Sequence, residues 1–92
     1  MLKIKKGFLL RRLGKECVAV AIGDASKAFN GMIRLNETGA FYWEELEKGA
    51  SEEDLVAKTL ERFENVDEDM ARCDVKEFLE IISLALDEYA DD

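Results

Sequence analysis

The side chains of this chain that could do chemistry are two cysteines and many carboxylates, and the sequence contains no histidine. Histidine is the commonest general base and the commonest transition-metal ligand in proteins. Without it, a Ser–His or Cys–His nucleophile pair cannot form within the chain, and a zinc site would need an unusual ligand set. Cys17 and Cys73 lie in no Cys-x-x-Cys pair. We therefore interpret both as buried or half-buried small apolar residues.

Motifs for phosphate and nucleotide binding are absent as well. Neither Gly-x-x-x-x-Gly-Lys-Ser/Thr nor Gly-x-Gly-x-x-Gly occurs in the sequence. With no general base, no metal-ligand set and no phosphate loop, we predict no catalytic residues, no metal and no cofactor. The chain is therefore expected not to be an enzyme on its own, and the sequence favours a binding function.

Composition and charge restrict the class of protein and its partners. The chain has 92 residues, of which 48% are hydrophobic and 37% charged, and this predicts a single folded domain over residues 1–92. The net charge of −8 is divided unevenly: residues 1–36 carry 8 Lys/Arg against 2 acidic residues, and residues 37–92 carry 5 against 19. The acidic half would repel a phosphate backbone, and the boundary between the two halves would orient a charged partner.

The sequence gives no signal for a membrane or for secretion. No apolar run approaches the roughly 18 residues that a transmembrane helix needs. The N-terminal segment is basic but has neither a long apolar block nor a small-residue cleavage site. We therefore expect a cytoplasmic protein that has no membrane partner.

The elements that must position a binding site begin with extended segments. Residues 2–13 alternate apolar and polar side chains, which predicts a first strand whose buried face carries Leu2, Ile4, Phe8 and Leu10. After a turn at Gly14-Lys15, residues 16–22 predict a second strand whose one face is small: Cys17, Ala19 and Ala21. Residues 23–31 predict a loop in which Phe29 anchors into the core. Met32–Leu35 predicts the last strand.

Helix-capping residues then mark three helices. Asn36 is expected to cap a helix over residues 37–48 that ends at Gly49. Ser51 opens a second helix with the spacing of a capping box, and Asp67 caps a third. Apolar residues at helical spacing predict that the third helix continues to Tyr89. Its apolar stripe is widened by Ile81, Leu84 and Ala85, which leaves open whether it forms a second contact surface or is deeply buried.

The predicted order is therefore three strands followed by three helices. This is an α+β fold in which the helices cover the apolar face of a three-stranded antiparallel sheet. A small sheet has open edges whose N–H and C=O groups are unpaired, and an extended peptide can add to such an edge as a further strand. We therefore interpret the edge of the strand Met32–Leu35 as the working part of the molecule.

The sequence around this edge resembles the PqqD family. The resemblance is carried by Phe-Asn-Gly-Met-Ile-Arg-Leu-Asn-Glu-Thr-Gly-Ala at residues 29–40, the aromatic helix that follows, Gly-Ala-Ser-Glu-Glu-Asp-Leu at 49–55, Val-Asp-Glu-Asp at 66–69, Asp74-Val75 and Phe78-Leu79. It implies a winged-helix-like fold of three strands and three helices. It also implies a non-catalytic chaperone that binds the leader of a ribosomally made precursor peptide. Such a chaperone presents the leader to a modifying enzyme, often a radical SAM protein, in PQQ biosynthesis or another peptide pathway.

The resemblance further implies where the leader binds. In that family the leader adds as an antiparallel strand beside the third strand, in a groove walled by the third helix. Carried onto this sequence, the edge consists of Asn30, Gly31, Met32, Ile33, Arg34 and Leu35. For the wall we predict one flank of the third helix, made by Arg72, Lys76, Leu79, Glu80 and Ser83. Arg34 and Lys76 are predicted to pair with an acidic leader residue, the alternative being that both are ordinary exposed cations.

Two other functions stay open at this stage. A winged-helix nucleic-acid-binding protein would need a basic face on its third helix, and Arg72 and Lys76 are the only cations there. A purely structural subunit, or a homodimer that exchanges a strand into the same groove, would bind no peptide. The peptide-binding hypothesis fails if the edge is already paired within the monomer or shielded by its own loop.

Overall fold

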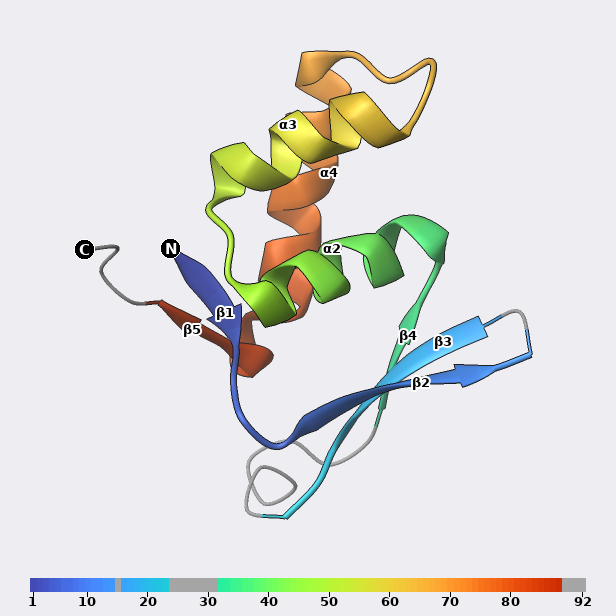
Figure 1. The fold of residues 1–92 in the computed structure, drawn as a ribbon, viewed down its shortest axis with the longest axis vertical. Helices are drawn as coiled ribbons and strands as arrows, with labels where there is room; N and C mark the ends of the chain where they lie inside the picture. Colours follow the sequence, from blue (N-terminus) through green and yellow to red (C-terminus); the bar gives the residue numbers. More distant parts are fainter. Residues whose placement is uncertain (15, 24–31, 89–92) are drawn as a thin grey trace.

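Within residues 1–14, 16–23 and 32–88, which the computed structural model describes, the chain folds into two small antiparallel sheets and three α-helices (Figure 1). The elements are β1 (Leu2–Ile4), β2 (Phe8–Leu13), β3 (Glu16–Ala21), β4 (Met32–Leu35), α2 (Glu37–Lys48), α3 (Glu52–Arg62), α4 (Glu68–Ile81), the 3₁₀ turn η1 (Ser83–Ala85) and β5 (Leu86–Glu88). One sheet has the order β2-β3-β4, and the other pairs β1 with β5. The predicted α+β class with a three-stranded antiparallel sheet is confirmed.

The face of the three-stranded sheet that meets the helices carries small side chains, as predicted. Across β3 and β4, Cys17 pairs with Leu35 and Ala19 with Ile33. Cys17, Ala19 and Leu35 are buried in the core, and Ile33 packs against it. Because the side chains of Cys17 and Ala19 are short, α2 can lie close to the sheet, and Figure 1 shows it between the sheet and α3.

The predicted single strand over residues 2–13 is wrong, because the chain turns between β1 and β2. Gly7 has a φ of 97°, a conformation that glycine adopts without steric cost, and its carbonyl accepts a hydrogen bond from the N–H of Ile22 at 2.6 Å. The expected apolar set of Leu2, Ile4, Phe8 and Leu10 does pack against the core, although it comes from two sheets. The alternation of apolar residues therefore continues across both strands, and the pattern alone does not reveal the turn between them.

The third helix ends earlier than its apolar spacing predicted. α4 stops at Ile81, and the chain then passes through η1 into β5, which pairs with β1 in the register Leu2 to Glu88 and Ile4 to Leu86. The prediction of helix up to Tyr89 is wrong over residues 82–88, and Tyr89 itself lies outside the described residues. Pairing with β1 supplies backbone hydrogen bonds, and Leu86 still packs against the core.

The core is formed where the three helices meet the sheet. Its largest fully buried side chains are Trp43, Tyr42, Leu46, Leu55, Ile82 and Val75. The predicted caps are present: the Asn36 side chain accepts from the N–H of Gly39, Ser51 and Asp54 form both bonds of a capping box, and Asp67 accepts from Met70. Each helix therefore starts at the residue that the sequence predicted.

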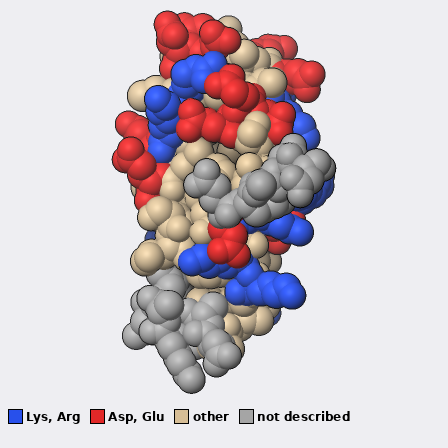
Figure 2. Space-filling model, turned by 90° about the vertical axis from the view of Figure 1, so that its left-hand side faces the viewer, with Lys and Arg blue, Asp and Glu red and all other residues tan. Residues whose placement is uncertain are grey.

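The charge is distributed as the two halves of the sequence indicate. On the face shown in Figure 2, acidic side chains are concentrated over the upper, helical end of the molecule.

Cys17 is buried, as predicted, whereas Cys73 is exposed, so its predicted burial is wrong. Among the described residues, no helix has the length and apolar character needed to cross a membrane.

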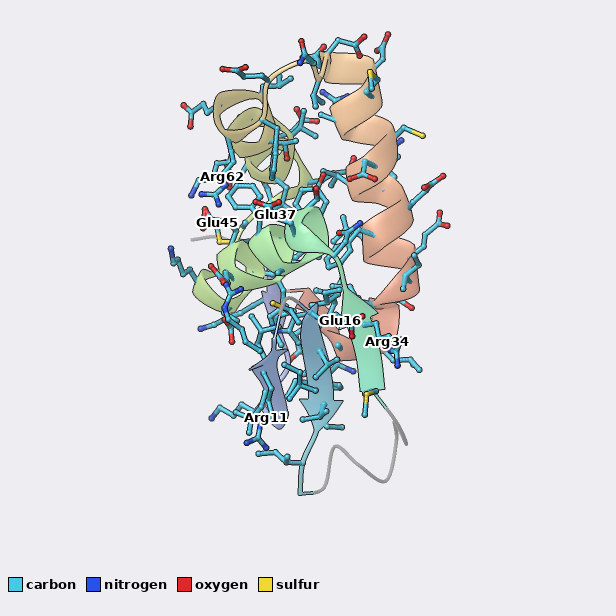
Figure 3. All side chains as sticks on the ribbon, turned by 90° about the vertical axis from the view of Figure 1, so that its right-hand side faces the viewer. Arg11, Glu16, Arg34, Glu37, Glu45 and Arg62 are labelled. Atoms are coloured by element: carbon cyan, nitrogen blue, oxygen red, sulfur yellow. The ribbon has the colours of Figure 1, made fainter. Side chains whose placement is uncertain are left out.

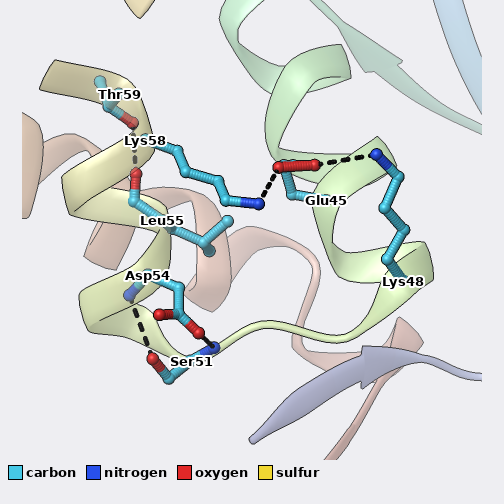
Figure 4. A network of polar contacts seen from close by, with 7 residues as sticks. All are labelled: Glu45, Lys48, Ser51, Asp54, Leu55, Lys58 and Thr59. Carbon is cyan, nitrogen blue, oxygen red and sulfur yellow. Dashed lines mark hydrogen bonds and ion pairs between the residues drawn. The ribbon is translucent and has the colours of Figure 1, made fainter. Parts of the chain in front are cut away.

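A nearly buried carboxylate joins α2 to α3 (Figure 4). Glu45 is 7% exposed, and it accepts hydrogen bonds from Lys58 Nζ at 2.6 Å and Lys48 Nζ at 3.4 Å. The bond from Lys58 is the main cause that lowers the pKa of Glu45 below the ordinary value of 4.5, although burial opposes it. The ionised form of Glu45 therefore stabilises the contact between the two helices.

The variant Glu45→Gln is expected to be about 1 kcal/mol less stable than the wild type at pH 7, because its amide makes weaker bonds to the two lysines. Since the pKa of Glu45 is lowered in the folded state, its contribution is present above pH 4.5 and is lost as the pH falls through the lowered pKa. The two proteins should therefore converge in acid. Urea denaturation at a series of pH values measures this, with the exposed Glu47→Gln on the same helix as the control.

Candidate functional site

One edge of the three-stranded sheet is open along β4. β4 pairs with β3 on one side, and no described strand pairs with it on the other. In an antiparallel strand, alternate residues direct their N–H and C=O groups to opposite sides. Half of the backbone polar groups of Met32–Leu35 therefore point away from β3, and within the described residues no strand takes them up. This edge can pair with a further strand.

A groove runs beside this edge, between β4 and α4. Figure 3 shows β4 lying next to the C-terminal part of α4, with Arg34 on the strand. The lining comes from β4, the start of α2 and one face of α4: Ile33, Arg34, Leu35, Asn36, Gly39, Tyr42, Asp74, Glu77, Phe78 and Ile81. A chain that paired with β4 would therefore lie against α4.

The floor of the groove is apolar and depends on a glycine. A Cβ placed on Gly39 would lie 3.2 Å from Phe78 Cε1 and 3.3 Å from Asn36 Oδ1, closer than side chains normally approach, and 3.4 Å from Leu35 Cδ2. The missing side chain thus lets the Phe78 ring lie close to α2, where its centroid is 5.1 Å from that of Tyr42. Phe78 is 9% exposed, so the floor is continuous with the core. An apolar side chain fits on such a surface.

The α4 wall of the groove carries a carboxylate that α2 holds in place. The Tyr42 hydroxyl donates to Asp74 Oδ2 at 2.7 Å. Burial, and then the hydrogen bond to Asp74, raises the pKa of Tyr42 to about 12. The phenol therefore stays protonated at neutral pH and donates to Asp74 continuously. The negative charge of Asp74 has a fixed position at the wall of the groove.

Two more charged groups flank the groove. Arg34 on β4 and Glu77 on α4 are both exposed, and neither forms an ion pair with any residue that the structure describes. Arg34 also borders a neighbouring hollow together with Glu16 and Glu37. The groove thus has carboxylates on its helix side, and the strand that borders it carries a cation on its outer face.

The strand residues predicted for the site lie where the sequence placed them. Met32, Ile33, Arg34 and Leu35 form β4 at the edge of the sheet. Asn30 and Gly31 lie outside the described residues, as does Phe29, which was predicted to anchor a loop into the core. Ile33 and Leu35 turn toward the helices, and Met32 and Arg34 lie on the opposite face of the sheet.

The α4 residues predicted for the wall do not line this groove. Arg72 pairs with Glu53 of α3, with one N–O distance of 3.2 Å, and it lies 3.9 Å from Glu68. Leu79 packs against the core, and the remaining three residues are exposed: Lys76, Glu80 and Ser83. At 100° per residue the four that belong to α4 lie roughly across the helix from the groove-lining set of Asp74, Glu77, Phe78 and Ile81, and Ser83 lies in η1, beyond the end of α4.

A signal for the side of α4 that lines the groove was present in its widened apolar stripe. Ile81 is 71% exposed and Leu84 63% exposed, whereas Ala85 is buried. The sequence left open whether these residues form a second contact surface or are deeply buried, and the answer differs between them. Ile81 and Leu84 form part of an accessible apolar surface, whereas Ala85 belongs to the core. Ile81 lines the groove. A large apolar residue of a helix that lies outside the core thus indicates which face of that helix is accessible.

Fold and site together define a small α+β protein with an open sheet edge beside a helix. Residues 16–85 match the family described as coenzyme PQQ synthesis protein D, and the chain belongs to this PqqD family. No curated protein matches the chain.

Two solved structures share its fold. One is TbiB1 in complex with the TbiA(beta) leader peptide, with a TM-score of 0.76 and 23% identity over 97% of this chain and 99% of that one. The other is lasso peptide synthetase B1 complexed with the leader peptide, with a TM-score of 0.70 and 17% identity over 89% of each chain. At this level of identity the comparison concerns the fold.

Proposed function

We propose that this protein is a non-catalytic peptide-binding chaperone that captures the leader of a ribosomally made precursor peptide and presents it to a modifying enzyme. The leader adds as an antiparallel strand to β4. The observation that carries this proposal is the open edge of β4 beside an apolar groove. Membership of the PqqD family supports it, as does the fold shared with two proteins solved with leader peptides.

The proposed peptide-binding residues combine the predicted edge with the observed groove. The backbone of Met32–Leu35 pairs with the leader, and Asn30 and Gly31, which precede β4 in the sequence, stay proposed contacts. On α4 we replace the predicted flank by the residues that line the groove: Asp74, Glu77, Phe78 and Ile81. Arg34 stays a candidate for charge pairing, and Lys76 does not, because Lys76 lies outside the groove lining.

The finer assignments follow from the family resemblance. We propose a radical SAM protein as the class of modifying enzyme and the cytoplasm as the location. The chain itself contributes no catalytic residue and binds no cofactor, so the chemistry on the precursor belongs to the enzyme. An exchanged strand from a second copy would compete for the same edge, and peptide binding is then expected to dissociate such a homodimer.

The test is to search the genes beside its own for a small precursor peptide and to titrate the ¹⁵N-labelled protein with the leader segment of that peptide, followed by NMR. Amide resonances of Met32–Leu35 are expected to shift, together with those of Asp74–Ile81. β2 is the internal control, because it is the other edge of the same sheet and its resonances should stay in place. A leader that binds while shifting only amides outside β4 and α4 would refute strand addition at this edge.

A further inference from the structure

The two faces of β4 differ in chemistry, and this determines what an added strand must carry. Ile33 and Leu35 pair with the core residues Ala19 and Cys17 on the helix side. On the outer face Arg34 pairs with Val18. Side chains of neighbouring antiparallel strands that lie opposite each other point to the same face of the sheet. The residues of a bound peptide therefore alternate between the groove and the outer face.

The groove side offers an apolar floor and a negatively charged wall. A peptide residue opposite Ile33 or Leu35 points toward Phe78 and Ile81, which favours a large apolar side chain. The next residue on the same face is about 7 Å away along the strand. It lies within reach of the wall that carries Asp74 and Glu77. Because Tyr42 holds the Asp74 carboxylate in place, this position favours Lys or Arg.

The outer side offers positive charge at one register position. Arg11 and Arg34 flank Val18 from the two neighbouring strands, and Figure 3 shows both arginines. Val18 is 3% exposed. A peptide residue opposite Arg34 extends this cross-strand row, and opposite charges in such pairs stabilise the sheet. An acidic residue is therefore favoured there, and a lysine is disfavoured beside the two arginines.

We infer that the protein recognises a leader in which the side chains alternate in charge from one face of the strand to the other, so that the pattern repeats every two residues. On the face toward α4 it carries a large apolar residue and, two positions away, a Lys or Arg for Asp74 and Glu77. On the other face it carries an acidic residue opposite Arg34. This inference rests on the proposed function, since it names the peptide class that the edge of β4 selects.

The experiment is a selection of randomised dodecapeptides displayed on phage against four proteins. These are the wild type, Arg34→Glu, the double variant Asp74→Asn with Glu77→Gln, and Lys76→Glu. Asn at position 74 keeps an acceptor for the Tyr42 hydroxyl. Lys76→Glu is the matched control, because it changes an exposed charge on α4 outside the groove. Circular dichroism verifies that each variant is folded.

The wild type and Lys76→Glu are expected to enrich peptides with a common alternating pattern. In these peptides a basic and an apolar residue are separated by two positions and so face the same side, and an acidic residue at an intervening position faces the other side. Arg34→Glu should exchange the acidic residue for a basic one, and the double variant should lose the basic preference. Exchanging Lys for Glu at the inward position of a selected synthetic peptide should weaken binding to the wild type about tenfold. Alternating apolar peptides without charge preference would refute the charge pattern and leave strand addition standing. No enrichment on a folded wild type would refute both.

Discussion

Replacing Leu46 with alanine is expected to lower the free energy of unfolding by about 3 kcal/mol, near the middle of the roughly 2–5 kcal/mol that such buried changes cost. Leu46 lies on α2, is 0% exposed, and belongs to the cluster that contains Trp43 and Leu55. Its truncation removes apolar burial and leaves a cavity between α2 and its neighbours. Because Trp43 is the only tryptophan, its fluorescence follows unfolding in urea.

The matched control is Leu13→Ala. Leu13 is the same residue type but is 58% exposed on β2, so its truncation should change the free energy of unfolding by less than about 1 kcal/mol. The comparison holds the chemistry constant and varies only burial. Equal losses in the two variants would contradict the position of Leu46 in the core.

The starts of the helices could be predicted from the sequence because a cap is a local contact. Asn36 and Asp67 each accept a hydrogen bond from the N–H three residues later, and Ser51 does the same within its capping box. Such bonds need no information about the rest of the fold. The edge strand was predictable for the same reason, because Met32–Leu35 ends where the cap of α2 begins.

The pairing of β1 with β5 could not be predicted from local pattern. Both strands have three residues, which is too short to show a period, and their partners lie at opposite ends of the chain. Leu86 follows the helical spacing of α4, yet it is used in a strand. The energy that decides its conformation comes from hydrogen bonds to β1, which the spacing of apolar residues does not report.

The side of α4 that faces β4 could not be predicted either. Ala71, Val75 and Phe78 define the buried stripe of the helix, and this stripe has two flanks. Periodicity shows which residues are buried but carries no information about which flank lies next to a given strand. Only the packing of α4 against the other helices places Asp74 at the groove and Arg72 against α3.

Methylation of single backbone nitrogens of the bound leader is expected to weaken binding with a period of two residues. In a strand added to β4, every second N–H donates to the sheet, and the N–H groups between them point away. A methyl group on a donating nitrogen removes one hydrogen bond and leaves a carbonyl of the edge unpaired. The expected loss is about 2 kcal/mol, or roughly thirtyfold in Kd. Isothermal titration calorimetry with a series of singly methylated peptides measures it.

The intervening methylated peptides are the control, because they have the same composition and are expected to bind within about threefold of the unmodified leader. A series of alanine substitutions separates this effect from that of the side chains, which alternate between the groove and the outer face. Losses that recur every three or four residues would indicate a helix lying in the groove of Phe78 and Ile81, and the edge of β4 would then be no binding element. Losses that recur every two residues, by contrast, require main-chain pairing. Met32–Leu35 is the strand edge that lies beside the groove.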